Sequence, residues 1–213
     1  MSAAWYTLRA LMVFAFAVVA IPAQAVHAQT PAPPRTAAPQ PRSNARASVR
    51  VMTLTSPAFA DGGMIPALHA QTGRDVSPPL VWRDAPDSAR SFVLLVYDAD
   101  AAIGDGTDNV LHWMAWNIPG TALSLPQGVA QGAQAADGMR QVSASGPYYR
   151  GPAAPTTGPA HHYVFELYAL DGTLNVAAVG LSPVATRAAV MAGMAGHVRG
   201  KGVLVGLYRR PAP

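Results

Sequence analysis

The chain has 213 residues, of which 50% are apolar and only 12% are charged, so it is long enough for one domain with a substantial core. Its net charge of +4 does not indicate nucleic-acid binding, because four of the 15 basic residues precede Arg50 and the others only match the 11 acidic residues in number. There is no cysteine, which excludes disulfides, thiolate nucleophiles and cysteine-based metal sites.

The first 28 residues have the order of a secretory signal peptide. Arg9 precedes an uncharged apolar run over residues 10–23, and small-residue cleavage sites follow at Ala23-Gln24-Ala25 and Val26-His27-Ala28. The run is shorter than the roughly 20 residues that span a bilayer. We therefore expect cleavage after Ala25 or Ala28 and a periplasmic or secreted protein. A retained N-terminal anchor is the alternative.

Residues 29–48 are rich in Pro, Ala, Arg and Gln and contain almost no large apolar side chain. Such a segment cannot bury enough surface to offset the entropy lost on ordering, and its prolines favour extended chain. We predict a disordered linker here. The folded domain is then expected over residues 49–213.

The domain reads as a series of strands with one late helix. Apolar and polar residues alternate over residues 49–54, which is typical of a half-buried strand. The continuous apolar run 91–97 is typical of a central strand that is covered on both faces. Two aromatic-rich runs at 111–118 and 163–170 and a last strand at 203–208 follow the same pattern. One helix is predicted from Pro183, capped by Ser182, to about Arg199. This order favours an antiparallel β domain over a βαβ one.

Polar residues gather where these strands meet turns. Asp98 and Asp100 follow the central apolar run, and His112 opens the next run. His161, His162 and Tyr163 open a third, after a loop rich in Gly and Pro. Binding residues often lie at such positions on a rigid scaffold, although Asp at a strand end also suits turn capping. His162 should face away from His161 on a strand.

Two stretches of the chain have the order and spacing of known motifs. The first stretch comprises Ser77-Pro78-Pro79-Leu80-Val81-Trp82, Tyr97-Asp98-Ala99-Asp100, His112-Trp113 and Asn117-Ile118-Pro119. The second comprises Gly151-Pro152, Pro155, Gly158 and His161-His162-Tyr163, running into Phe165-Glu166-Leu167-Tyr168-Ala169-Leu170-Asp171. In these motifs the chain resembles the phosphatidylethanolamine-binding family, and within it the bacterial YbhB/YbcL, Raf-kinase-inhibitor-like branch.

The resemblance implies a mainly β fold of two antiparallel sheets with a few peripheral helices. It also implies a pocket for a small anion, such as phosphate, acetate or a phospholipid-headgroup-like ligand. The ligand-binding residues carried over by motif are Asp98, Asp100, His112, Gly151, Pro152, His161 and Tyr163. Two positions depart from the family pattern. The usual Asp-Pro-Asp is Asp98-Ala99-Asp100 here, and the usual His-Arg-Tyr is His161-His162-Tyr163, which removes one permanent positive charge.

Carboxylates beside an anion site are compatible with binding if they act through the histidines. An aspartate that accepts from one ring N–H fixes the tautomer and favours the charged ring, and the other ring nitrogen can then donate to the anion. Backbone N–H groups of the Gly-Pro loop and the Tyr163 hydroxyl are expected to add donors. We predict that affinity for the anion weakens as the pH rises through the histidine titration.

The sequence gives little support for an enzymatic function. Two Asp and two His suit a divalent metal, but there is no HExxH or comparable helical spacing, and no Gly-x-Ser-x-Gly elbow, P-loop or dinucleotide motif. We therefore expect a binding protein without enzymatic activity, cofactor or nucleic-acid partner. The alternative is a protein-interaction module, such as a kinase or protease inhibitor, that uses the pocket rim. The sequence names no protein partner.

Overall fold

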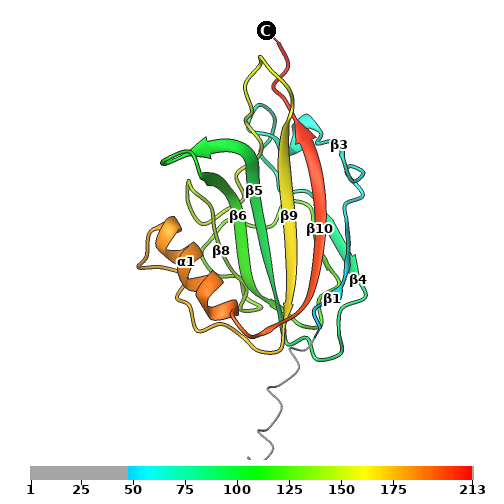
Figure 1. Cartoon of the computed structure of the whole chain (residues 1–213), viewed down its shortest axis with the longest axis vertical. Helices are drawn as coiled ribbons and strands as arrows, with labels where there is room; N and C mark the ends of the chain where they lie inside the picture. Colours follow the sequence, from blue (N-terminus) through cyan, green and yellow to red (C-terminus); the bar gives the residue numbers. More distant parts are fainter. Residues whose placement is uncertain (1–47, 213) are drawn as a thin grey trace, which may run out of the picture. The chain divides into compact units, whose positions relative to one another are not determined.

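The structure is a computed structural model that describes residues 48–212, so the predicted signal peptide and residues 29–47 of the predicted linker lie outside the described residues. Strands dominate the described part (Figure 1), which confirms the mainly β fold. In chain order the elements are β1 (Arg50–Val51), β2 (Thr53–Thr55), β3 (Gly63–Met64), the 3-10 helix η1 (Ala67–His69), β4 (Leu80–Arg83), β5 (Ser91–Ile103), β6 (Asp108–Pro119), β7 (Ser124–Leu125), β8 (Arg140–Val142), β9 (His161–Leu170), α1 (Pro183–Met194) and β10 (Val198–Tyr208).

The larger of two sheets has seven strands in the order β1-β10-β9-β5-β6-β8, with β3 also paired to β10. The four long strands β10, β9, β5 and β6 lie side by side (Figure 1) and pair antiparallel, as predicted. Only the short strands β1 and β3 pair parallel, both with β10. Long antiparallel strands place the ends of β5 and β9 next to each other, and this is where the polar residues lie.

A smaller sheet of three strands, in the order β2-β4-β7, covers one face of the larger sheet. The main core fills the space between them, with Trp82 of β4 packed edge-on against Phe92 of β5 at 5.3 Å between ring centroids. Gly206 permits the close approach of neighbouring chain, because an added Cβ would lie 2.5 Å from a side-chain carbon of Ile65.

The other face of the larger sheet is partly covered by α1. Val190 and Met194 of the helix pack in one cluster with Val93, Leu95 and Trp116 of the sheet. Since Phe92 and Leu94 face the main core, strand β5 is buried on both faces, as its continuous apolar run predicts. Within residues 48–212, no helix combines the length and apolar character needed to span a bilayer.

The helix starts where predicted but ends earlier. The Ser182 side chain accepts from the Ala185 N–H at 3.2 Å, and Pro183 occupies the first helical position. The predicted end near Arg199 is wrong, because α1 stops at Met194 and Gly196 follows with a φ of +81°. Residues from Val198 onward belong to β10, which is longer than the predicted strand 203–208.

The first predicted strand, residues 49–54, is divided between the two sheets. Arg50 and Val51 pair with β10 of the larger sheet, whereas Thr53 and Leu54 pair with β4 of the smaller one. Met52 lies between them, is 3% exposed and donates its N–H to the Lys201 carbonyl. The alternating pattern therefore marks a crossing between two sheets, since alternation alone does not say which sheet a strand joins.

Candidate functional site

Asp98 lies near the end of the buried half of β5, opposite Tyr163 of β9. The residue is 3% exposed, and Oδ1 accepts from the N–H groups of Asp100 at 3.0 Å and Ala101 at 3.1 Å. Oδ2 lies 2.9 Å from Nδ1 of His161. One carboxylate thus binds both the main chain of its own strand and the His161 ring, which also lies 3.1 Å from Oδ1.

The first residue of β9, His161, is held by this pairing. Its Nδ1 donates to the Asp98 carboxylate, which requires the proton on Nδ1 whether the ring is neutral or charged. Within the described chain, Nε2 of His161 has no hydrogen-bond partner, and the side chain keeps 20% of its surface exposed. Protonation of this ring would therefore turn the outward nitrogen from an acceptor into a donor and add a positive charge.

His112, the fifth residue of β6, is held in the same tautomer by main-chain carbonyls instead of a carboxylate. Its Nδ1 donates to the main-chain carbonyls of Arg150 at 2.8 Å and Gly151 at 3.1 Å. The residue is 4% exposed, and burial lowers the pKa of His112 despite the carbonyl contacts and the nearby Asp98 charge, which raise it. At neutral pH the ring is uncharged, so Nε2 carries a lone pair and accepts hydrogen bonds.

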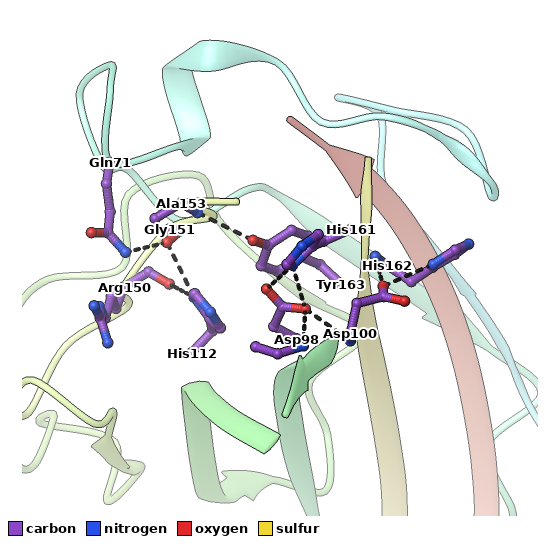
Figure 2. Close-up of polar contacts among 11 residues, drawn as sticks. Gln71, Asp98, Asp100, His112, Arg150, Gly151, Ala153, His161, His162 and Tyr163 are labelled. Carbon is purple, nitrogen blue, oxygen red and sulfur yellow. Dashed lines mark hydrogen bonds and ion pairs between the residues drawn. The ribbon is translucent and has the colours of Figure 1, made fainter. Parts of the chain in front are cut away.

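Tyr163 completes the cluster between the two histidines. Its ring meets the His112 ring edge-on, with centroids 5.0 Å apart. The phenol oxygen accepts from the Ala153 N–H at 3.2 Å. Burial raises the pKa of Tyr163, so the hydroxyl keeps its proton and can donate it. Figure 2 shows His112, Asp98, His161 and Tyr163 lying together.

The Gly151-Pro152 segment has a role different from the one expected. The Gly151 N–H donates to Asp75 at 2.6 Å, Pro152 has no N–H, and the Ala153 N–H is taken by Tyr163. The N–H groups of Gly151 and Ala153, which were expected to donate to an anion, are thus bonded within the protein. The Gly151 carbonyl instead helps to orient His112, and glycine is required because a Cβ at Gly151 would lie 2.2 Å from the His69 carbonyl oxygen.

Asp100 is separated from the cluster, although the sequence placed it beside Asp98. Its Oδ2 accepts from both the main-chain N–H and Nδ1 of His162, and this pair is exposed. The hydrogen bond from the His162 main chain is the main cause that lowers the pKa of Asp100. His162 points away from His161, as its place in a strand predicts (Figure 2). Two Asp–His pairs thus lie next to each other, one buried and one exposed.

Among residues 48–212, no group of three or more His, Asp or Glu side chains is arranged to hold a metal ion. The two histidine rings also point their Nδ1 atoms at protein acceptors, which leaves one nitrogen on each for a ligand. The arrangement suits hydrogen bonding to one small polar group.

Comparison with known proteins agrees with this fold. A model of the family described as phosphatidylethanolamine-binding protein matches residues 55–209. The chain belongs to this family. A UPF0098 protein of Methanothermobacter thermautotrophicus is 39% identical over 161 residues, covering 75% of this chain and 99% of that protein. The UPF0098 protein YbhB of Escherichia coli is 37% identical over 127 residues, covering 56% of this chain and 78% of that protein.

Solved structures show the same fold. The crystal structure of a putative phosphatidylethanolamine-binding protein homologue from Chlamydia trachomatis has a TM-score of 0.61 at 29% identity, covering 76% of this chain and 99% of that one. That of Escherichia coli YbcL has a TM-score of 0.62 at 23% identity, covering 75% and 98%. The resemblance to the phosphatidylethanolamine-binding family, including its YbhB/YbcL relatives, is thereby confirmed.

In this family member, residues far away in sequence hold the site, and no local pattern marks them. Gln71 donates Nε2–H to the Gly151 carbonyl at 2.7 Å across a separation of 80 residues, and Asp75 accepts from the N–H of the same glycine. Arg150 was part of the Gly/Pro loop in the sequence but was not expected in the site. Its carbonyl is the nearer of the two that orient His112 (Figure 2).

Proposed function

We propose that the domain is a binding protein for a phosphate group, free or carried by a phospholipid-headgroup-like molecule, at the cluster of Asp98, His112, His161 and Tyr163. The observation that carries the proposal is the matched tautomer of the two histidines. His161 donates its Nδ1–H to Asp98, and His112 donates its Nδ1–H to the loop carbonyls. Each ring therefore has Nε2 available for a ligand.

The charge of Asp98 has to be reconciled with an anionic ligand. A neutral His112 offers a lone pair, and the nearby carboxylate is negative, so a fully deprotonated anion is disfavoured unless a ring takes up a proton. A phosphate that keeps one P–OH can donate to Nε2 of His112 and accept from the Tyr163 hydroxyl. Protonation of a ring at lower pH adds a donor and a positive charge. Affinity for phosphate should therefore weaken as the pH rises.

The proposal includes binding without catalysis. The four side chains of the cluster supply donors, acceptors and one apolar ring edge, but no serine, threonine or lysine nucleophile. It also includes export, supported by the signal-like residues 1–28, and therefore a periplasmic or secreted location. A nucleic-acid partner is not proposed, since the 11 basic residues from Arg50 onward equal the 11 acidic residues in number.

Calorimetric titration of the full chain with inorganic phosphate at about pH 6 tests the proposal. His161→Ala should weaken binding about tenfold or more, which corresponds to about 1.4 kcal/mol. His162→Ala is the matched control, because it removes the neighbouring, exposed imidazole, and it should leave affinity within about twofold. Absence of phosphate binding by the unaltered chain, or equal losses in the two variants, would contradict the proposal.

A further inference from the structure

A groove of about 620 Å³ lies between α1 and the β5–β6 hairpin, on the face of the larger sheet that α1 covers. Its volume is within the range of small-molecule sites. None of the four cluster residues Asp98, His112, His161 and Tyr163 lines it, and Tyr163 belongs to the main core on the opposite face of the sheet. The groove is therefore a second concave feature, separate from the proposed phosphate site.

On the helix side, the groove is lined by an apolar stripe. Val184, Ala188 and Met191 follow one another at helical spacing, and Val184 is 80% and Met191 40% exposed. The single charged residue of α1, Arg187, donates to Asn109 of β6 at 2.7 Å. A surface helix normally presents charged or polar residues to solvent, and an apolar stripe normally packs against another group. This stripe of α1 is therefore suited to a partner.

The hairpin side of the groove is apolar as well. Ile103, Val110 and Leu111 line it, and Ile103 is 45% exposed. Single exposed apolar residues are ordinary on protein surfaces, but here they line both walls of one concave feature. Covering both walls would bury apolar surface at about 25 cal/mol per Å². An occupant with apolar groups on two opposite sides is therefore favoured.

One acidic and one basic side chain line the groove without a partner. Within residues 48–212, neither the Asp108 nor the Arg150 side chain makes a hydrogen bond or an ion pair. Asp108 begins β6, whereas the Arg150 N–H donates to the carbonyl of His112, four residues further along the strand, at 3.0 Å. The Arg150 side chain extends away from His161 (Figure 2). Since a strand advances about 3.3 Å per residue, the two charges are anchored about 13 Å apart along β6.

A short peptide with free ends has the matching features. Its amino group is positive and its carboxylate negative at about pH 7, and in an extended chain successive side chains point to opposite sides. At about 3.3–3.6 Å per residue, the two ends of an extended tetrapeptide lie roughly 10–14 Å apart. A guanidinium pairs with a carboxylate, and an aspartate accepts from an ammonium group. A fatty acid would match Arg150 but would leave Asp108 without a partner.

We propose that the groove binds short apolar peptides with free ends, of about three to five residues. The peptide carboxylate lies at Arg150, the amino group lies at Asp108, and the side chains cover the walls formed by α1 and the hairpin. The two charges set the direction and the length of the peptide. This is a second binding activity of the domain, and it does not depend on phosphate binding at the histidine cluster.

Calorimetric titration of the full chain at about pH 7 with the tetrapeptide Ala-Val-Ala-Val tests the proposal. We expect saturable binding with a Kd of about 1 mM or tighter. Amidation of the peptide carboxylate and acetylation of its amino group should each weaken binding about fivefold or more, and tetraglycine should bind more weakly because it has no apolar side chains. Absence of saturable binding, or equal affinity of the free and capped peptides, would overturn the inference.

Charge variants of the protein identify which end lies where. Arg150→Gln keeps the main-chain groups that contact His112 and should abolish the difference between free and amidated peptide. Asp108→Asn should abolish the difference between free and acetylated peptide. Asp105→Asn and Arg83→Gln are the matched controls, because both residues are exposed and lie outside the groove lining, and both differences should persist in them. Persistence of the differences in Arg150→Gln and Asp108→Asn would overturn the inference.

Matched tryptophan variants locate the peptide. Ala188→Trp fills the groove from an exposed helical position, whereas Ala185→Trp changes an exposed position on the same helix outside the groove lining. Ala188→Trp should weaken peptide binding about tenfold or more, and Ala185→Trp should leave it within about twofold. Equal behaviour of the two variants would overturn the inference. If light scattering instead shows a dimer that Ala188→Trp dissociates, and no peptide binds, the groove is an interface between two copies of the chain and the inference is wrong.

Discussion

Nδ1 of His161 lies 2.9 Å from Oδ2 of Asp98, across 63 residues of sequence and between two neighbouring strands. The other oxygen of the same carboxylate lies 3.1 Å from the same Nδ1 and accepts from the main-chain N–H groups of Asp100 and Ala101, further along β5. These contacts with the β5 main chain hold the Asp98 carboxylate in the orientation that meets the ring. The orientation of His161 is therefore a consequence of the β5 backbone.

Replacing Asp98 by asparagine should break the histidine contact while keeping the contacts with the β5 main chain. Oδ1 can still accept from the main chain, but the amide NH₂ then faces the Nδ1–H of His161, and two donors cannot pair. We expect loss of about 1.5–3 kcal/mol of stability in urea unfolding. We also expect transfer of the ring proton to Nε2, visible in ¹⁵N NMR of the histidines at about pH 8.

Asp100→Asn serves as the control for that variant, because Asp100 pairs with the exposed His162. An exposed pair contributes about 0–1 kcal/mol, so the loss of stability should be smaller and the His161 tautomer unchanged. If His161 keeps its Nδ1 proton in Asp98→Asn, or if both variants behave alike, the orienting role of Asp98 is wrong.

His112 should make the fold sensitive to acid. Burial lowers the pKa of His112 below the ordinary value of about 6.5, so the unfolded chain takes up this proton at a higher pH than the folded one. The contribution of His112 to the free energy of unfolding is complete above about pH 6.5 and is lost as the pH falls toward the pKa of the folded state. The loss is about 1.4 kcal/mol for each unit by which the pKa of the folded state lies below that of the unfolded state.

Urea unfolding of the unaltered chain and of His112→Asn between about pH 7.5 and 5 measures this effect. The asparagine amide can donate to the Arg150 carbonyl but does not titrate, so the variant should lose less stability on acidification. If the free energy of unfolding changes with pH in the same way for the two proteins, His112 takes up its proton equally in the folded and unfolded states, and the expected effect is absent.

Gly151→Ala should damage both stability and binding. The added Cβ would lie 2.2 Å from the His69 carbonyl oxygen and 2.6 Å from Oδ1 of Asp75, so the loop must shift and carry the His112 acceptors with it. Overpacking of this kind costs about 1–3 kcal/mol. Gly172→Ala is the control, since a Cβ there meets nothing within 4 Å. Thermal unfolding and phosphate titration should separate the two variants, and similar results would contradict the proposed tight packing.

The strands were predictable because their signal is local. Residues 91–97 form a continuous apolar run, and such a run matches a strand that is covered on both sides. The end of α1 was not predictable, because Ala195 and Val198 continue the apolar pattern past Met194, while the positive φ of Gly196 ends the helix. Apolar pattern and backbone conformation conflict there, and tertiary pairing of β10 with β9 decides the outcome.

The sequence predicted which residues lie at the site, but not which partner each of them contacts. Motifs indicated Asp98, Asp100, His112 and His161, yet a spacing of two residues could not show that Asp100 pairs with His162. The partners of Gly151 lie about 80 residues earlier, at Gln71 and Asp75, where nothing in the local sequence refers to the loop. Long-range contacts between such side chains and a loop main chain leave no periodic signature in the sequence.

The measurement that tests the account most directly compares phosphate with sulfate on the full chain at about pH 8. Phosphate keeps a P–OH there that can donate to Nε2 of the neutral His112, whereas sulfate has no proton to give. We expect phosphate to bind about tenfold or more tightly, with the difference narrowing as acid protonates the rings. Equal binding of the two anions at about pH 8 would mean that charge alone is recognised, and would contradict the role assigned to the two imidazoles.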